Sequence, residues 1–132
     1  MKKIEEGNNL MQWQEVCEHP SLQNLPFKIE LNEWGQILMS PVKVYHSAFQ
    51  GKITRLLPEH GIVLPECAIR TTKGTKVADI AWCSEERFKL IEHEAECSIA
   101  PELCIEVIVN RPPRRIPQSI TVFKGERTAS IA

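Results

Sequence analysis

At 132 residues, the chain has the length of one domain with a buried core and leaves little room for a second. Its formal net charge of −1 argues against strong non-specific electrostatic binding to nucleic acid, so any DNA contact must come from local charge. The 5 cysteines include no CxxC spacing, which argues against a disulfide framework or a zinc site and favours a reduced, cytoplasmic protein. No segment approaches the length of a membrane span, so we expect neither export nor insertion into a membrane.

The N-terminal half predicts a short helix, a β-hairpin and one long helix. Apolar residues at loosely helical spacing from about Asn9 to Glu18 predict the short helix, which ends before a proline. Two short runs, 27–31 and 36–39, flank a turn that contains Asn and Gly, and they predict the hairpin. From Val42 to Leu57, apolar side chains recur at helical spacing until Pro58 stops the pattern, which predicts the longest helix.

The second half predicts three further strands. The run from Ile62 to Ile69 indicates an irregular strand that Pro65 interrupts, and a turn then leads into an apolar strand over 76–82. A charged, partly helical segment over 84–96 separates this strand from another at 101–109. Together these elements predict an α/β or α+β fold, with a mixed sheet, a β-hairpin and one long helix on a face.

The chain divides into a core over residues 1–109 and a tail over residues 110–132. The tail begins with three closely spaced prolines and several arginines, which forbid a regular helix and make the segment locally basic. We expect it to be poorly ordered or extended.

Two acidic residues interrupt the apolar strands. Asp79 lies within Val77–Trp82, and Glu106 lies within Leu103–Val109. A carboxylate among such neighbours is costly to bury unless it binds a cation or hydrogen-bond donors, and a hard divalent metal could serve both acids. The competing interpretation is a half-exposed sheet, in which both acids simply face water.

An ordered set of residues is similar to a known family. The set comprises 25–31 (LPFKIEL), 35–41 (GQILMSP), His46, Asp79 and 100–107 (APELCIEV). It resembles the restriction endonucleases often labelled Uma, a branch of the PD-(D/E)XK nuclease superfamily, over about Trp13 to Val109. The resemblance implies a restriction-endonuclease-like core.

The resemblance also implies roles for named residues. Asp79 and Glu106 would hold Mg²⁺ or Mn²⁺, which polarises the scissile phosphate and activates a water, with the Val107 backbone carbonyl as a further ligand. His46 would position substrate or transfer a proton, although a lone His on an apolar helix is often a core or rim residue. Glu30 would be the family's acid near the first strand; otherwise it is an exposed strand acid beside Lys28.

The chain departs from the family pattern after Val109. The superfamily lysine that follows the acid by two residues is replaced by Ile108, and the lysine-containing helix and closing strands of the family are not recognisable. This boundary motivates the hypothesis of a frameshift or truncation, which resequencing of the coding DNA would test. The Glu106 strand would then expose an apolar edge that a second chain or the tail covers, so we expect a homodimer or higher assembly.

Two functions follow from these observations. The first is a Mg²⁺-dependent DNA endonuclease, or an incomplete relic of one. The alternative is a non-catalytic module that binds nucleic acid or a protein through the basic tail: Arg111, Arg114, Arg115, Lys124 and Arg127. A lysine or arginine within reach of Asp79 and Glu106 in space would favour the enzyme.

Overall fold

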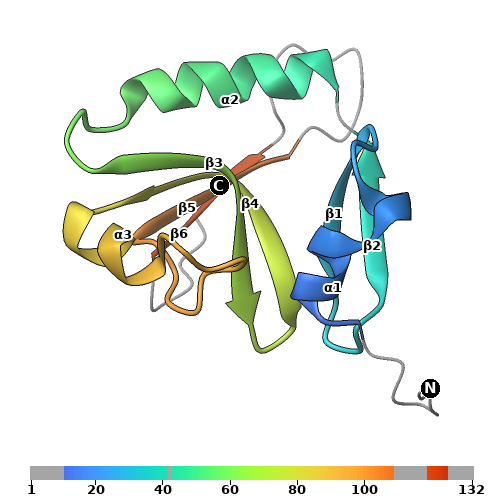
Figure 1. Ribbon diagram of the computed structural model, residues 1–132. Coiled ribbons are helices and arrows are strands. Elements are labelled where there is room, and N and C mark those ends of the chain that lie inside the picture. The colour runs from blue at the N-terminus through green and yellow to red at the C-terminus, as the bar shows by residue number, and fades with distance from the viewer. Residues whose placement is uncertain (1–10, 42, 109–118, 125–132) are drawn as a thin grey trace.

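The computed structural model describes residues 11–41, 43–108 and 119–124 and has the expected mixed α+β architecture (Figure 1). A two-stranded sheet, β1-β2, stands beside a four-stranded sheet with the order β3-β4-β5-β6. The elements are α1 (Trp13–Glu18), the 3-10 helix η1 (Pro20–Leu22), β1 (Phe27–Leu31), β2 (Ile37–Pro41), α2 (Val44–Leu56), β3 (Ile62–Thr71), β4 (Gly74–Cys83), α3 (Glu85–Ile91), β5 (Leu103–Ile108) and β6 (Ser119–Lys124).

The predicted hairpin is β1-β2. Its strands pair antiparallel from Phe27↔Pro41 to Leu31↔Ile37. The Asn32 side chain accepts hydrogen bonds from the backbone N–H groups of Trp34 and Gln36, and Gly35 adopts a φ of 73°, which glycine tolerates best. The turn chemistry in the sequence therefore closes the hairpin as expected.

The four-stranded sheet is antiparallel throughout, rather than mixed, among its described strands. Pro65 does not interrupt β3, which runs continuously and pairs Pro65 with Ile80. Because β3 lies at the edge of the sheet, a residue without an N–H can be accommodated there. One isolated parallel bridge, Ile69↔Cys97, joins β3 to the segment before β5.

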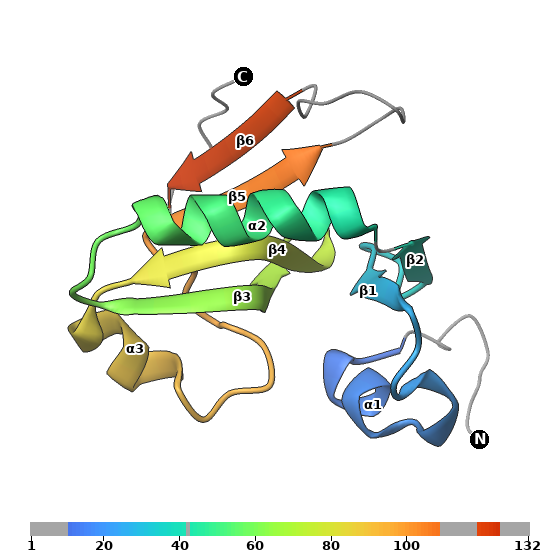
Figure 2. The ribbon, with the colours of Figure 1, turned by 90° about the horizontal axis from the view of Figure 1, so that it is seen from above.

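The long helix α2 crosses one face of the sheet, over β4 and β5, as Figure 2 shows. It begins at Val44 and ends at Leu56, close to its predicted bounds, and its inner side chains are half-buried. The core lies against the sheet between β3, β4, β5 and α3, and its buried residues are Cys67, Ile69, Ala78, Ala81, Cys83, Ile91, Cys97 and Cys104.

The tail contains a strand. β6 pairs with β5 from Leu103↔Lys124 to Ile108↔Ser119, so the edge of the Glu106 strand is covered by the chain's own C-terminal segment. Of the two coverings expected for this edge, a second chain or the tail, the structure shows the tail, and residues 119–124 form a closing strand that the sequence analysis did not recognise. The prolines that argued against structure all precede this segment, which is itself rich in β-branched and aromatic residues. The basic stretch 111–117 lies outside the described residues.

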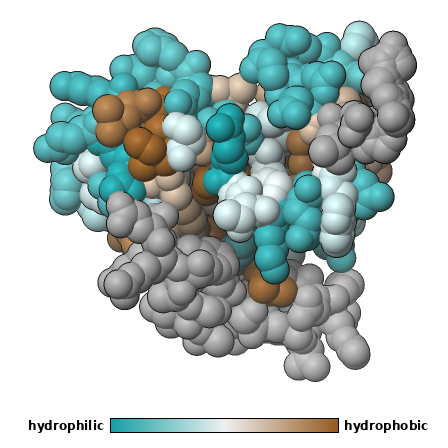
Figure 3. Space-filling view, turned by 90° about the horizontal axis from the view of Figure 1, so that it is seen from below, coloured by the Kyte–Doolittle hydropathy of each residue, from teal (hydrophilic) through white to brown (hydrophobic). Residues whose placement is uncertain are grey.

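On the face opposite α2, the described residues that Figure 3 leaves visible are mostly hydrophilic, with small apolar patches among them. None of the helices in the described part of the chain is long and apolar enough to cross a membrane. Small exposed apolar patches are ordinary on the surface of a folded protein.

Candidate functional site

The two acids predicted from the sequence meet where β4 and β5 separate. The β4–β5 ladder runs from Trp82↔Leu103 to Ile80↔Ile105, and Asp79 and Glu106 are the next residues on their strands. Asp79 is 1% exposed, whereas the Glu106 side chain is 32% exposed. One carboxylate is therefore deeply buried, and its partner opens toward solvent.

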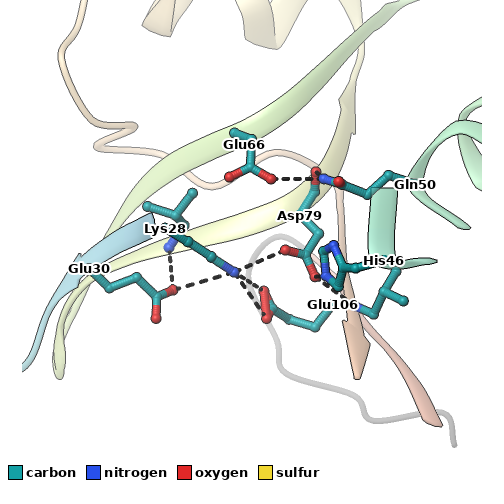
Figure 4. Close-up of polar contacts among 9 residues, drawn as sticks. Lys28, Glu30, His46, Gln50, Glu66, Asp79 and Glu106 are labelled. Atoms are coloured by element: carbon teal, nitrogen blue, oxygen red, sulfur yellow. Dashed lines mark hydrogen bonds and ion pairs between the residues drawn. The ribbon is translucent and has the colours of Figure 1, made fainter. Parts of the chain in front are cut away.

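A lysine that the sequence analysis did not assign lies between the two acids (Figure 4). Lys28 Nζ on β1 is 3.0 Å from Asp79 Oδ1 and 3.1 Å from Glu106 Oε2. Burial lowers the pKa of Lys28, but Glu106 and Asp79 raise it by more, so the pKa lies above its ordinary value. The ammonium group stays charged and neutralises part of the acid pair.

The second oxygen of Asp79 has two further donors. Oδ2 accepts the backbone N–H of Val107 at 2.7 Å and lies 3.1 Å from His46 Nε2. The Val107 N–H is available because β5 has already parted from β4 at this position. In a strand, the N–H and C=O of one residue point to the same side, so the Val107 carbonyl lies on the β4 side of β5. His46 and the Val107 N–H thus both contact the buried carboxylate of Asp79.

Glu30 lies beside this cluster and contacts it through Lys28. Its Oε2 is 3.9 Å from Lys28 Nζ and accepts the backbone N–H of Val77 at 2.7 Å. Glu30 therefore fastens the hairpin to β4, which places Lys28 over the acids. This contact gives Glu30 a positioning role.

Gln50, another residue that the sequence analysis missed, ties α2 to the site. Its Nε2 donates to the backbone carbonyl of Asp79 at 2.9 Å and to Glu66 Oε2 at 2.8 Å. Gln50 follows His46 by one helical turn, so both polar side chains project from one face of α2. In the sequence, two polar residues one helical turn apart on a largely apolar helix were the pattern that could have indicated Gln50 as a site residue.

The environment perturbs the titration of Glu106. Burial and the negative charge of Asp79 raise its pKa to about 7, while Lys28 acts in the opposite direction. Near neutral pH, Glu106 therefore exchanges its proton readily and is available both as a ligand and as a proton acceptor.

The oxygen atoms of the site are of the kind that bind a divalent cation. Mg²⁺ is usually held by one or two carboxylates with several waters, and Asp79, Glu106 and the Val107 carbonyl provide oxygens of that kind. The described residues include no group of three or more His, Cys, Asp or Glu side chains placed to hold a metal. These oxygens fit a Mg²⁺ site in which two carboxylates and several waters bind the ion, provided that Lys28 Nζ leaves its position between the acids.

Comparison with known proteins adds no assignment: no family model matches the chain, and no match is found among curated proteins. The similarity to the Uma endonucleases therefore stays a prediction from the sequence.

Proposed function

We propose that the chain is a Mg²⁺-dependent phosphodiester hydrolase that cleaves DNA as an endonuclease. One observation carries the proposal. The acids Asp79 and Glu106, which lie on neighbouring strands, share a lysine ammonium group within 3.0 Å and 3.1 Å. Two acids and a lysine are the chemical parts that the resemblance requires, and Lys28 supports the proposal by supplying a lysine near the acids although the usual position in the sequence is Ile108.

The residues would divide the chemistry between them. Asp79, Glu106 and the Val107 carbonyl would hold Mg²⁺ or Mn²⁺, which when bound polarises a phosphate oxygen and lowers the pKa of a water. The Lys28 ammonium would stabilise the negative charge that develops on the phosphate. His46 holds the buried carboxylate of Asp79 in position, 3.1 Å from Nε2. A cytoplasmic location agrees with cysteines that are all free thiols.

A second function is favoured by the same hydrogen bonds. Asp79 already has three protein donors: Lys28, His46 and the Val107 N–H. Lys28 thus supplies the positive charge that a metal would otherwise bring. A nuclease-like fold that has lost catalysis and serves as an interaction module could keep this network for stability alone.

Calorimetric titration with Mg²⁺ or Mn²⁺, with plasmid nicking measured on the same samples, tests these functions. The variants are Asp79→Ala/Glu106→Ala and, as a matched control, Glu33→Ala/Glu59→Ala, which removes two exposed acids. The endonuclease predicts binding and nicking that are lost in the first variant and kept in the control. Metal binding without nicking favours the interaction module, and wild-type protein that neither binds metal nor nicks contradicts the endonuclease.

A further inference from the structure

Two buried cysteines outside the acidic site are in direct contact. The Sγ atoms of Cys67, on β3, and Cys97, in the segment before β5, are 3.6 Å apart. Their residues are 8% and 7% exposed. No other sulfur–sulfur hydrogen bond joins cysteines within the described ranges; Cys104 donates instead to the Pro101 carbonyl.

Backbone hydrogen bonds on both sides hold Cys97 against β3. Its N–H donates to the Ala68 carbonyl at 2.8 Å, and its own carbonyl accepts from the Arg70 N–H at 3.0 Å. These two bonds form the parallel bridge between Ile69 and Cys97. The contact between the two thiols is therefore fixed by the backbone as well as by side-chain packing.

We propose that Cys67 and Cys97 form a redox site that peroxides oxidise to a reversible disulfide. Hydrogen peroxide is small enough to reach thiols that retain only slight exposure. Bonded sulfurs are about 2.05 Å apart, so the two Sγ atoms must approach by roughly 1.5 Å. This proposal does not depend on the nuclease function.

The hydrogen bond between the two thiols indicates which of them attacks the peroxide first. This hydrogen bond lowers the pKa of Cys97 and raises that of Cys67, which favours Cys97 as the attacking thiolate. Cys97 Sγ attacks one peroxide oxygen, the O–O bond breaks, and the leaving hydroxide takes up a proton to become water.

The second step closes the bond. Cys67 Sγ attacks the sulfur of the Cys97 sulfenic acid, the S–O bond breaks, and the departing hydroxide takes the Cys67 proton to give a second water. Two thiols are oxidised to one disulfide, and one peroxide is reduced to two waters. The product ties the segment before β5 covalently to β3.

The experiment uses the full chain with Cys17→Ser, which removes the exposed thiol, reduced with dithiothreitol and then treated with hydrogen peroxide. We expect a mass loss of about 2 Da, which dithiothreitol reverses, and a higher Tm in the oxidised protein. Trypsin leaves Cys97 and Cys104 on one peptide because no Lys or Arg separates them. Fragmentation of the cross-linked peptide must therefore identify Cys97 as the partner of Cys67.

Matched variants complete the test. Cys104→Ala should keep the cross-link, and Cys67→Ala should abolish it. The peptide map of the Cys17→Ser chain decides the matter even where one of the further variants fails to fold. Three results would overturn the proposal. The first is a cross-link between other cysteines, and the second is stepwise oxidation of Cys97 to sulfinic acid without a cross-link. The third is thiols that stay intact under a peroxide treatment that oxidises Cys17 in the unsubstituted chain.

Discussion

Lys28 is the residue on which the charge balance of the site depends. Its side chain is 15% exposed, and its ammonium group lies between two carboxylates. Lys28→Met is expected to lower the free energy of unfolding at pH 8 by about 3 kcal/mol, because breaking a buried ion pair leaves uncompensated charge. Urea denaturation checks this value. Lys89→Met, at an exposed lysine of α3, is the control and should change stability by less than about 0.5 kcal/mol.

The same substitution separates the structural and catalytic roles of Lys28. If its ammonium stabilises the transition state, nicking by Lys28→Met should fall by about 10² or more while Mg²⁺ still binds. Mg²⁺ should bind at least as well as in the wild type, because a competing cation has been removed. Equal stability of Lys28→Met and Lys89→Met would contradict the proposed charge balance.

Glu106 should give the metal-free protein a specific dependence on pH. Its pKa rises from an ordinary 4.5 to about 7 in the folded state. Between pH 4.5 and about pH 7, Glu106 holds a proton in the folded state that it has lost in the unfolded state. The contribution of Glu106 to stability is therefore complete below about pH 4.5 and is lost as the pH rises to about 7. Glu106→Gln should flatten this slope in urea denaturation series with a chelator present. An unchanged slope would assign the pH dependence to other groups.

At the scale of elements, β6 completes the sheet by covering β5. Removing residues 119–132 is expected to expose the β5 edge and cause self-association, because an unpaired strand edge can pair with another chain. Light scattering after size exclusion measures the mass, and removal of only residues 125–132 is the control that keeps β6. Equal mass and stability of the two truncated chains would show that β6 is dispensable.

The expected homo-oligomer stays a prediction, to be measured on the full chain in the same experiment. Its original basis was an uncovered edge of the Glu106 strand, and β6 occupies that edge. Any assembly of the full chain must therefore use another surface.

Local patterns predicted the elements well but could not predict which of them meet. Helical spacing in 42–57 anticipated α2, and carboxylates in apolar strands singled out Asp79 and Glu106. Lys28 precedes Asp79 by 51 residues, and only the docking of the hairpin on β4 brings them together. The sequence places Lys28 beside Glu30 on the first predicted strand, but nothing local relates Lys28 to Asp79. Strand β6 was missed because the nearby prolines dominated the composition of the tail.

At the scale of the whole molecule, the site spans the junction between the two sheets. The four-stranded sheet provides the acids, the hairpin provides Lys28, and α2 provides His46 and Gln50 (Figure 4). The site therefore depends on how closely the hairpin approaches β4. Gly74, at the start of β4, permits that approach: a Cβ there would meet the backbone of Leu31 and Asn32, and its φ is 100°.

Gly74→Ala should therefore disturb the site without altering any of its residues. Strain at φ 100° and the clash with the hairpin backbone are expected to lower the free energy of unfolding by about 2 kcal/mol. Movement of the hairpin takes Lys28 away from Glu106. Because Lys28 holds the pKa of Glu106 down, this pKa should rise above about 7, which carboxyl NMR titration measures.

Gly51→Ala is the control for this prediction. Gly51 lies within α2, and a Cβ there would meet nothing within 4 Å. Alanine should raise stability by up to about 1 kcal/mol through its helix propensity and leave the Glu106 pKa unchanged. If Gly74→Ala also left that pKa near 7, Lys28 would keep its place without close docking of the hairpin. The charge balance would then tolerate a shift of the hairpin and would not require its close approach to Gly74.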